Sequence, residues 1–102
     1  MNNPSKYGTE GCGYMDGEYL PMSEMRLPVT DLGFQLSDMC YDALHIRNGR
    51  YFRMADHLER FQRAIEERRY ESLDTGGQGF ANILHKCASK SGLHNAMVTI
   101  VA

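Results

Sequence analysis

The chain has 102 residues, of which 42% are hydrophobic and 24% charged, and its formal net charge is −2. This length corresponds to one domain with a single modest core, and the composition is typical of a soluble globular domain. The slight negative charge provides no general attraction to phosphate backbones or anionic lipids. We therefore expect neither a nucleic-acid nor a membrane partner.

Cysteine and histidine usage limits the other chemistry. Cys12, Cys40 and Cys87 are odd in number and widely spaced, which favours a reducing, cytoplasmic setting over a disulfide framework. No stretch has the apolar core of a signal peptide or of a membrane span. The four histidines form no pair or cluster with the spacing of a metal site, so we predict no metal.

The N-terminal third predicts an arm followed by a hairpin. Residues 1–13 are rich in Asn, Pro, Ser and Gly, and we expect a flexible arm there, with folding beginning at Tyr14. Asp16-Gly17 is typical of a two-residue hairpin turn. Pro21 and Pro28 bracket a segment that we expect to be an edge strand or an extended connection.

The middle of the chain predicts a second hairpin and then a helix. Residues 39–47 favour a strand, and Asn48-Gly49 then predicts a tight type I′ turn into residues 50–53. Alternation along the strand predicts one face that belongs to the core and an opposite face that lines a pocket or is half exposed. The expected core face carries Cys40, Leu44 and Ile46, and the opposite face carries Tyr41, Ala43 and His45. Apolar residues at helical spacing predict an amphipathic helix over residues 55–69.

The C-terminal third predicts a loop, a helix and a strand. Residues 71–79 are dense in glycine and favour a loop, and residues 80–91 favour a helix with Gly92 as its C-terminal cap. Residues 96–102 are nearly all apolar and predict a buried strand. The elements together predict an α+β domain.

Three motifs have both a functional and a structural interpretation. The glycines of residues 76–79 could present backbone donors to a phosphate, but a linker is favoured because no strand precedes them and no P-loop Lys follows. Cys40 with His57 could form a nucleophile and its base, but no third group is evident and a buried structural thiol is favoured. Arg60 shares a helix side with His57 and could hold a phosphate, or it could be a solvated surface charge.

The order of residues between Asp31 and Phe61 is more informative than any of them singly. In sequence, the chain has Asp31-x-Gly33, Ser37-Asp38, Tyr41, Asn48-Gly49, Phe52 and His57-Leu58-x-Arg60-Phe61. This order resembles the N-terminal domain of the class IV, or fold-type IV, pyridoxal-phosphate aminotransferases, which include branched-chain, D-amino acid and (R)-selective amine enzymes. The resemblance extends from about Gly17 to Ala102. Residues 21–26 and Ser37-Asp38 are most similar to the (R)-selective amine transaminases.

The resemblance implies the small N-terminal domain of the D-amino acid aminotransferase-like fold, built from antiparallel hairpins with two packed helices. Arg60 would bind the phosphate of pyridoxal 5′-phosphate, Tyr41 and Ala43 would line the substrate pocket, and His57 would brace the start of the helix. The intact enzymes of this family are homodimers. They transfer an amino group between an amine or amino acid and a keto acid, with the cofactor as electron sink.

The same resemblance places the Schiff-base lysine in a second domain, beyond Ala102. Lys6, Lys86 and Lys90 do not match its context. We therefore expect residues 14–102 to be the N-terminal small domain without the lysine-bearing domain. We expect no catalytic residue in this chain and no transamination by it alone. The end of the chain at an apolar strand favours this interpretation.

Two other hypotheses remain open. Aminodeoxychorismate lyases share this N-terminal architecture and eliminate pyruvate, and only residues of the second domain would distinguish them. Alternatively, the chain is a non-catalytic module that dimerises or binds a partner through apolar surface.

Overall fold

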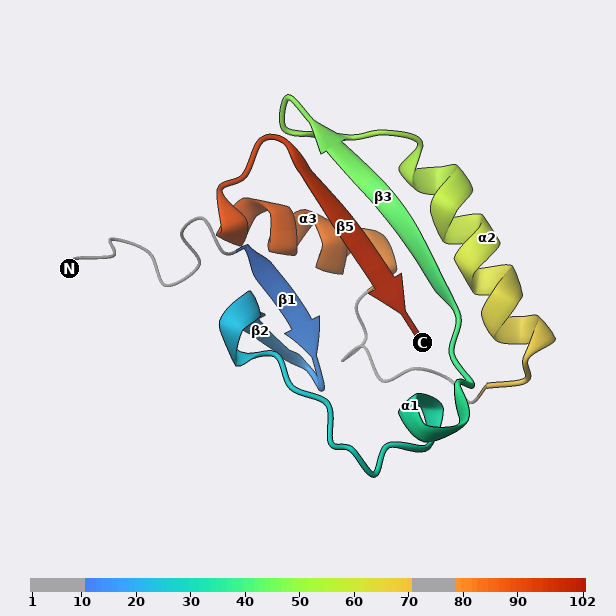
Figure 1. The fold of residues 1–102 in the computed structure, drawn as a ribbon. Helices are drawn as coiled ribbons and strands as arrows, with labels where there is room; N and C mark the ends of the chain where they lie inside the picture. The colour runs from blue at the N-terminus through green and yellow to red at the C-terminus, as the bar shows by residue number, and fades with distance from the viewer. Residues whose placement is uncertain (1–10, 71–78) are drawn as a thin grey trace.

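The computed structural model describes residues 11–70 and 79–102 of the chain. Two antiparallel sheets and two main helices make up an α+β domain, which confirms the predicted fold class (Figure 1). In chain order the elements are β1 (Cys12–Met15), β2 (Glu18–Pro21), the 3-10 helix η1 (Met22–Glu24), α1 (Leu32–Leu36), β3 (Tyr41–Arg47), β4 (Arg50–Tyr51), α2 (Met54–Glu67), α3 (Phe80–Ser91) and β5 (Ala96–Val101).

The first sheet is the hairpin of β1 and β2. Its turn has positive φ at Asp16 (52°) and Gly17 (83°), as a type I′ turn requires, so the predicted hairpin is confirmed. β1 begins at Cys12, which means that the regular structure starts two residues before Tyr14. The remainder of the predicted arm, residues 1–10, lies outside the described residues.

The second sheet has the strand order β4-β3-β5, with both pairs antiparallel. Positive φ at Asn48 (52°) and Gly49 (76°) confirms the tight turn between β3 and β4. β4 is only two residues long, shorter than the predicted strand over residues 50–53. β5 pairs with most of β3, from Tyr41 opposite Val101 to Ile46 opposite Ala96.

Both predicted helices are present. α2 covers most of the predicted range, and α3 matches its predicted range of residues 80–91. Gly92 caps α3 in the left-handed conformation, with φ of 68°, and its backbone N–H donates to the carbonyl of Ala88. Of the predicted loop and its glycine motif, only Gly79 is described, as the residue before α3.

The segment between the two sheets differs from the prediction. We predicted an edge strand or an extended connection between Pro21 and Pro28, and the 3-10 helix η1 occupies the first part of this segment. The short helix α1 then occupies a stretch for which we predicted no helix. The Asp31 carboxylate caps α1 by accepting from the backbone N–H of Phe34 at 2.9 Å.

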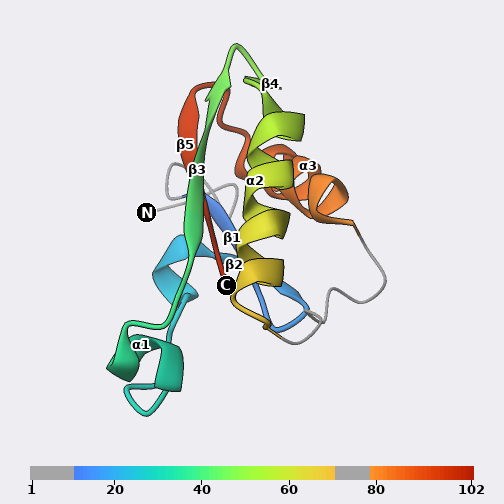
Figure 2. The ribbon, with the colours of Figure 1, turned by 90° about the vertical axis from the view of Figure 1, so that its right-hand side faces the viewer.

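The two main helices cover one side of the three-stranded sheet, as Figure 2 shows with the sheet nearly edge-on. Leu44, fully buried on β3, faces this side. Beside the start of β3, Phe61 and Ile65 of α2 pack with Cys40. The rings of Phe61 and Phe80 meet edge to face, with their centres 5.7 Å apart. These side chains form the core because each helix turns its apolar stripe towards the sheet.

The other side of this sheet carries no helix in the described part of the chain, and its side chains are exposed. Tyr41 is 73%, Met97 66% and Val101 57% exposed. Exposure alternates along β5, so the prediction of a wholly buried C-terminal strand is wrong. An uninterrupted apolar sequence predicts cover on both faces, whereas the helices supply it on only one.

Candidate functional site

β3 and α2 together position the predicted site residues. Side chains alternate along β3, so Asp42 points to the helix side of the sheet while Tyr41 and Ala43 point to the open side. Asp42 is only 5% exposed and is the buried charged residue of the described chain. A carboxylate at such a position requires partners to replace its lost hydration.

Two residues of α2 provide those partners. Arg60 donates from Nε to Oδ2 of Asp42 at 2.7 Å and from Nη2 to Oδ1 at 2.9 Å. His57 Nδ1 lies 2.7 Å from Oδ1. His57 and Arg60 reach the same carboxylate because residues three apart share one side of a helix.

Within the cluster formed by Asp42, His57 and Arg60, Asp42 and Arg60 stabilise each other's charged form. The hydrogen bond from Arg60 is the main cause that lowers the pKa of Asp42 from 3.8 to about 2, burial opposes it, and His57 adds to the lowering. Asp42 in turn raises the pKa of Arg60. Because the ionised carboxylate can only accept, the hydrogen of the His57 contact belongs to Nδ1.

The lowered pKa links this cluster to stability. A carboxyl group with a folded-state pKa below its unfolded value stabilises the fold above the unfolded pKa, and this contribution is lost as the pH falls through the folded pKa. For Asp42 the loss therefore extends over roughly pH 4 to 2.

The guanidinium of Arg60 has donors left for a ligand. Asp42 takes Nε–H and one Nη2–H, and among the described residues Nη1 has no hydrogen-bond partner. The Arg60 side chain is 67% exposed. Planar, charged, exposed N–H donors of this kind suit the oxygens of a phosphate, so the residue present fits a phosphate-bearing cofactor.

The N-terminus of α2 attracts a phosphate less strongly than its helix dipole alone would. Asp56 lies in the first turn and accepts from Arg53 Nε at 2.7 Å. This carboxylate already complements the partial positive charge of the helix end. Arg60 is thus the better anion-binding group of this helix.

Arg60 is joined to the strand that carries the predicted pocket residues. Its anchor, Asp42, lies between Tyr41 and Ala43 in sequence. The side chains of those two residues are nevertheless on the opposite face, where Tyr41 is exposed and Ala43 half-buried. The structure thus brings the three predicted residues to one end of β3 but divides them between the two faces of the sheet.

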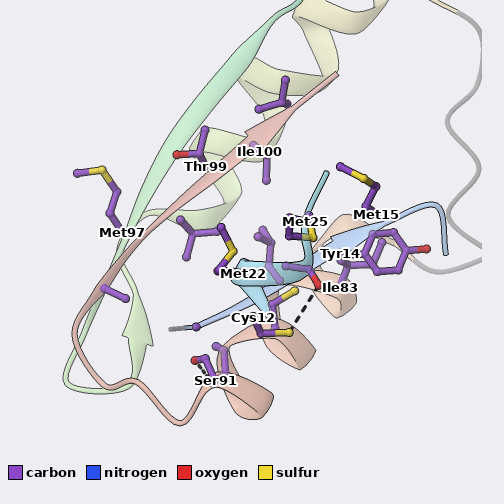
Figure 3. Close-up of a pocket in the computed structure, with 18 of the residues that line it drawn as sticks. Cys12, Tyr14, Met15, Met22, Met25, Ile83, Ser91, Met97, Thr99 and Ile100 are labelled. Atoms are coloured by element: carbon purple, nitrogen blue, oxygen red, sulfur yellow. Dashed lines mark hydrogen bonds between the residues drawn. The ribbon is translucent and has the colours of Figure 1, made fainter. Parts of the chain in front are cut away.

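A separate apolar groove of about 800 Å³ runs between β1, α3 and β5. Sulfur-containing side chains are prominent in its lining, among them Cys12, Met22 and Met25 (Figure 3). Arg60, Tyr41 and Ala43 do not line it. The groove is therefore distinct from the predicted site.

The other sequence motifs have structural roles or lie outside the residues that the structure describes. Cys40 is buried in the core beside Phe61, and His57 uses its Nδ1 for Asp42. Burial raises the pKa of the Cys87 thiol to about 12, so it stays protonated. Within residues 11–70 and 79–102, no three His, Cys, Asp or Glu residues converge as metal ligands, and no helix could span a membrane.

Asp42 is the site residue that we did not predict from the sequence. The signal was present, because Asp42 falls between Cys40 and Leu44 on the core-facing side of a predicted strand. A carboxylate at a core position needs a cationic or hydrogen-bonding partner. His57 and Arg60, three apart on the following helix, supply it.

Comparison with known proteins gives a partial relationship. No family model matches the chain. Curated D-alanine aminotransferases of Staphylococcus aureus strains N315 and COL are each 32% identical to it over 54 residues, which is 53% of this chain and 19% of the relative. The matched part thus spans about a fifth of the length of these relatives. The similarity supports an aminotransferase-like origin for this chain.

Proposed function

We propose that the chain is the cofactor-phosphate-binding part of a pyridoxal-phosphate-dependent aminotransferase of class IV. The observation that carries the proposal is the exposed guanidinium of Arg60, held by the buried carboxylate of Asp42. The partial similarity to D-alanine aminotransferases supports the same assignment. The substrates are an amine or amino acid, of branched-chain, D- or (R)-type, and a keto acid.

Arg60 binds the phosphate of the cofactor. Its remaining N–H donors and its permanent positive charge match the charge and geometry of phosphate oxygens. When bound, pyridoxal phosphate supplies an electron sink for amino transfer. The task of Arg60 is to bind and orient, and it moves no proton because the guanidinium stays charged.

Tyr41 and Ala43 line the substrate pocket on the open face of the sheet. Tyr41 offers an aromatic ring and a hydroxyl, and Ala43 leaves room beside it because its side chain is small. Their exposure, with Met97 and Val101 nearby on β5, supports a surface that another part of the assembly covers. We further propose that the intact protein is a homodimer in the cytoplasm.

The lysine that carries the cofactor lies outside these 102 residues. Lys86 and Lys90 belong to α3, and their Nζ atoms lie 5.9 and 5.5 Å from the ring centre of Tyr19 on the first hairpin. Both lysines thus contact the first hairpin, whereas Arg60 contacts Asp42 on β3, and this supports a different lysine. The match covers 19% of the relatives' length, so a protein of their full length would have ample further chain for this lysine.

Arg60→Ala tests the proposal in the native gene product. We expect pyridoxal 5′-phosphate to bind about 1.5–3 kcal/mol more weakly, the scale of a lost hydrogen bond to a charged group. Fluorescence titration of the apoprotein measures the affinity. Arg63→Ala is the matched control, because Arg63 lies on the same helix and its ion pair with Glu59 is exposed. Equal affinities for the two variants would remove Arg60 from the site.

A further inference from the structure

We infer that Asp42 is a positioning residue, which holds the guanidinium of Arg60 side-on so that its outer edge faces the cofactor phosphate. This inference rests on the proposed function, because it requires that Arg60 binds that phosphate. The buried carboxylate of Asp42 contacts Arg60 and His57. Its role is therefore to hold the Arg60 side chain in place.

The geometry of the pair carries the argument. A guanidinium has five N–H groups in a rigid plane. Asp42 engages Nε at 2.7 Å and Nη2 at 2.9 Å, which together form one edge of that plane. Nη2 also lies 3.3 Å from His57 Nδ1, but that nitrogen carries the hydrogen of its own bond to Asp42 and cannot accept a second one. The edge formed by Nη1 and the second Nη2 hydrogen is therefore left, and this edge can donate two parallel hydrogen bonds to a phosphate.

The anchor is rigid. Asp42 lies on β3 and is paired in register with Ile100 of β5. Its side chain is 4% exposed, and the hydrogen bond with His57 Nδ1 restricts the rotation of its carboxylate. Without this anchor, the long and exposed Arg60 side chain would sample many rotamers, and ordering them on binding would weaken the phosphate contact.

Asp42 also has an effect that opposes phosphate binding. Its negative charge partly neutralises Arg60 and repels an anion placed beyond it. We expect orientation to outweigh repulsion, because the guanidinium stands between the two anions and the solvent around Arg60 screens the longer interaction. The two effects predict opposite changes when the charge of Asp42 is removed.

The test compares pyridoxal 5′-phosphate with pyridoxal, which lacks the phosphate, as ligands of the native apoprotein. In Asp42→Asn we expect the affinity for the phosphorylated ligand to fall by about tenfold, the scale of one lost charged hydrogen bond. The affinity for pyridoxal should stay within about twofold, because only the phosphate contact depends on Arg60. Asp42→Glu restores the carboxylate and should regain part of the preference.

Each result decides a different claim. If Arg60→Ala keeps the preference for the phosphorylated ligand, the proposed function fails. If Arg60→Ala loses the preference and Asp42→Asn keeps or increases it, only the role of Asp42 fails. An equal loss of both ligands in Asp42→Asn would indicate a merely structural role and also overturn the inference.

A second measurement needs no variant and covers the case in which Asp42→Asn does not fold. The Nε–H signal of Arg60 in the nitrogen-15-labelled native protein should exchange slowly with water both before and after pyridoxal 5′-phosphate is added. Retention of this protection would show that Arg60 keeps its bond to Asp42 while it binds. Loss of protection on addition of the ligand would mean that Arg60 leaves Asp42, and would overturn the inference.

Discussion

Asp42 explains why a strand residue and two residues of the following helix, His57 and Arg60, depend on one another. Burying its carboxylate is unfavourable unless hydrogen bonds replace the lost hydration, and Arg60 and His57 provide three of them. In return, the carboxylate fixes a cation at the surface of the domain. In the proposed function, this structural residue would also prepare Arg60 for the cofactor phosphate.

Ala43 provides a prediction at this scale about specificity. Ala43→Phe in the native enzyme should change which amines are accepted more than it changes stability, because the added ring extends over the open face of β3. The measurement is the ratio of kcat/KM for a small and a bulky amine, together with a thermal melt.

His45→Phe is the matched control for this substitution. His45 lies on the same face, two residues farther along β3, and is exposed. It should alter the amine preference less than Ala43→Phe does. A large loss of stability in Ala43→Phe with an unchanged preference would place Ala43 in the packing of the fold instead of in the pocket.

At the scale of elements, the two hairpin turns depend on residues that tolerate positive φ. Gly17 has φ of 83°, and a Cβ at this position would meet no atom within 4 Å. Gly17→Ala should therefore lower the free energy of unfolding by about 1–2 kcal/mol through backbone strain alone. Gly17→Asn should cost clearly less, because Asn adopts the left-handed conformation more readily. Urea unfolding measures both, and equal losses would contradict the type I′ assignment.

The elements that sequence predicts well are those with local signals. Asp16-Gly17 and Asn48-Gly49 determine their turns by backbone conformation, and the apolar stripes of α2 and α3 mark the buried faces of these helices. α1 was missed because five residues with no buried side chain leave no periodic pattern. Only the capping side chain of Asp31 marks its start.

Tertiary placement explains the remaining differences. The apolar sequence of β5 does not specify how many of its faces are covered, since that depends on where α2 and α3 pack. Asp42 was not predicted, whereas Arg60, Tyr41 and Ala43 could be proposed individually from the family resemblance. Their arrangement could not, because the pairing of Asp42 with Arg60 depends on how α2 lies against β3.

At the scale of the whole molecule, the domain presents two different surfaces of the same sheet. The helix side contains the core and the anchored Arg60, and the open side exposes Tyr41, Met97 and Val101. An apolar face of this kind commonly marks an interface. In the proposed function, the cofactor phosphate would lie at Arg60 and the substrate beside Tyr41.

The central claim is that this chain belongs to an enzyme that carries pyridoxal phosphate on a lysine. The most direct test is to reduce the native gene product with borohydride, which fixes a lysine-bound cofactor irreversibly, and to determine the masses of its peptides. We expect a phosphopyridoxyl group on a lysine other than Lys6, Lys86 and Lys90, the three lysines of this chain. A native product without the adduct, or with the adduct on one of these three lysines, would contradict it.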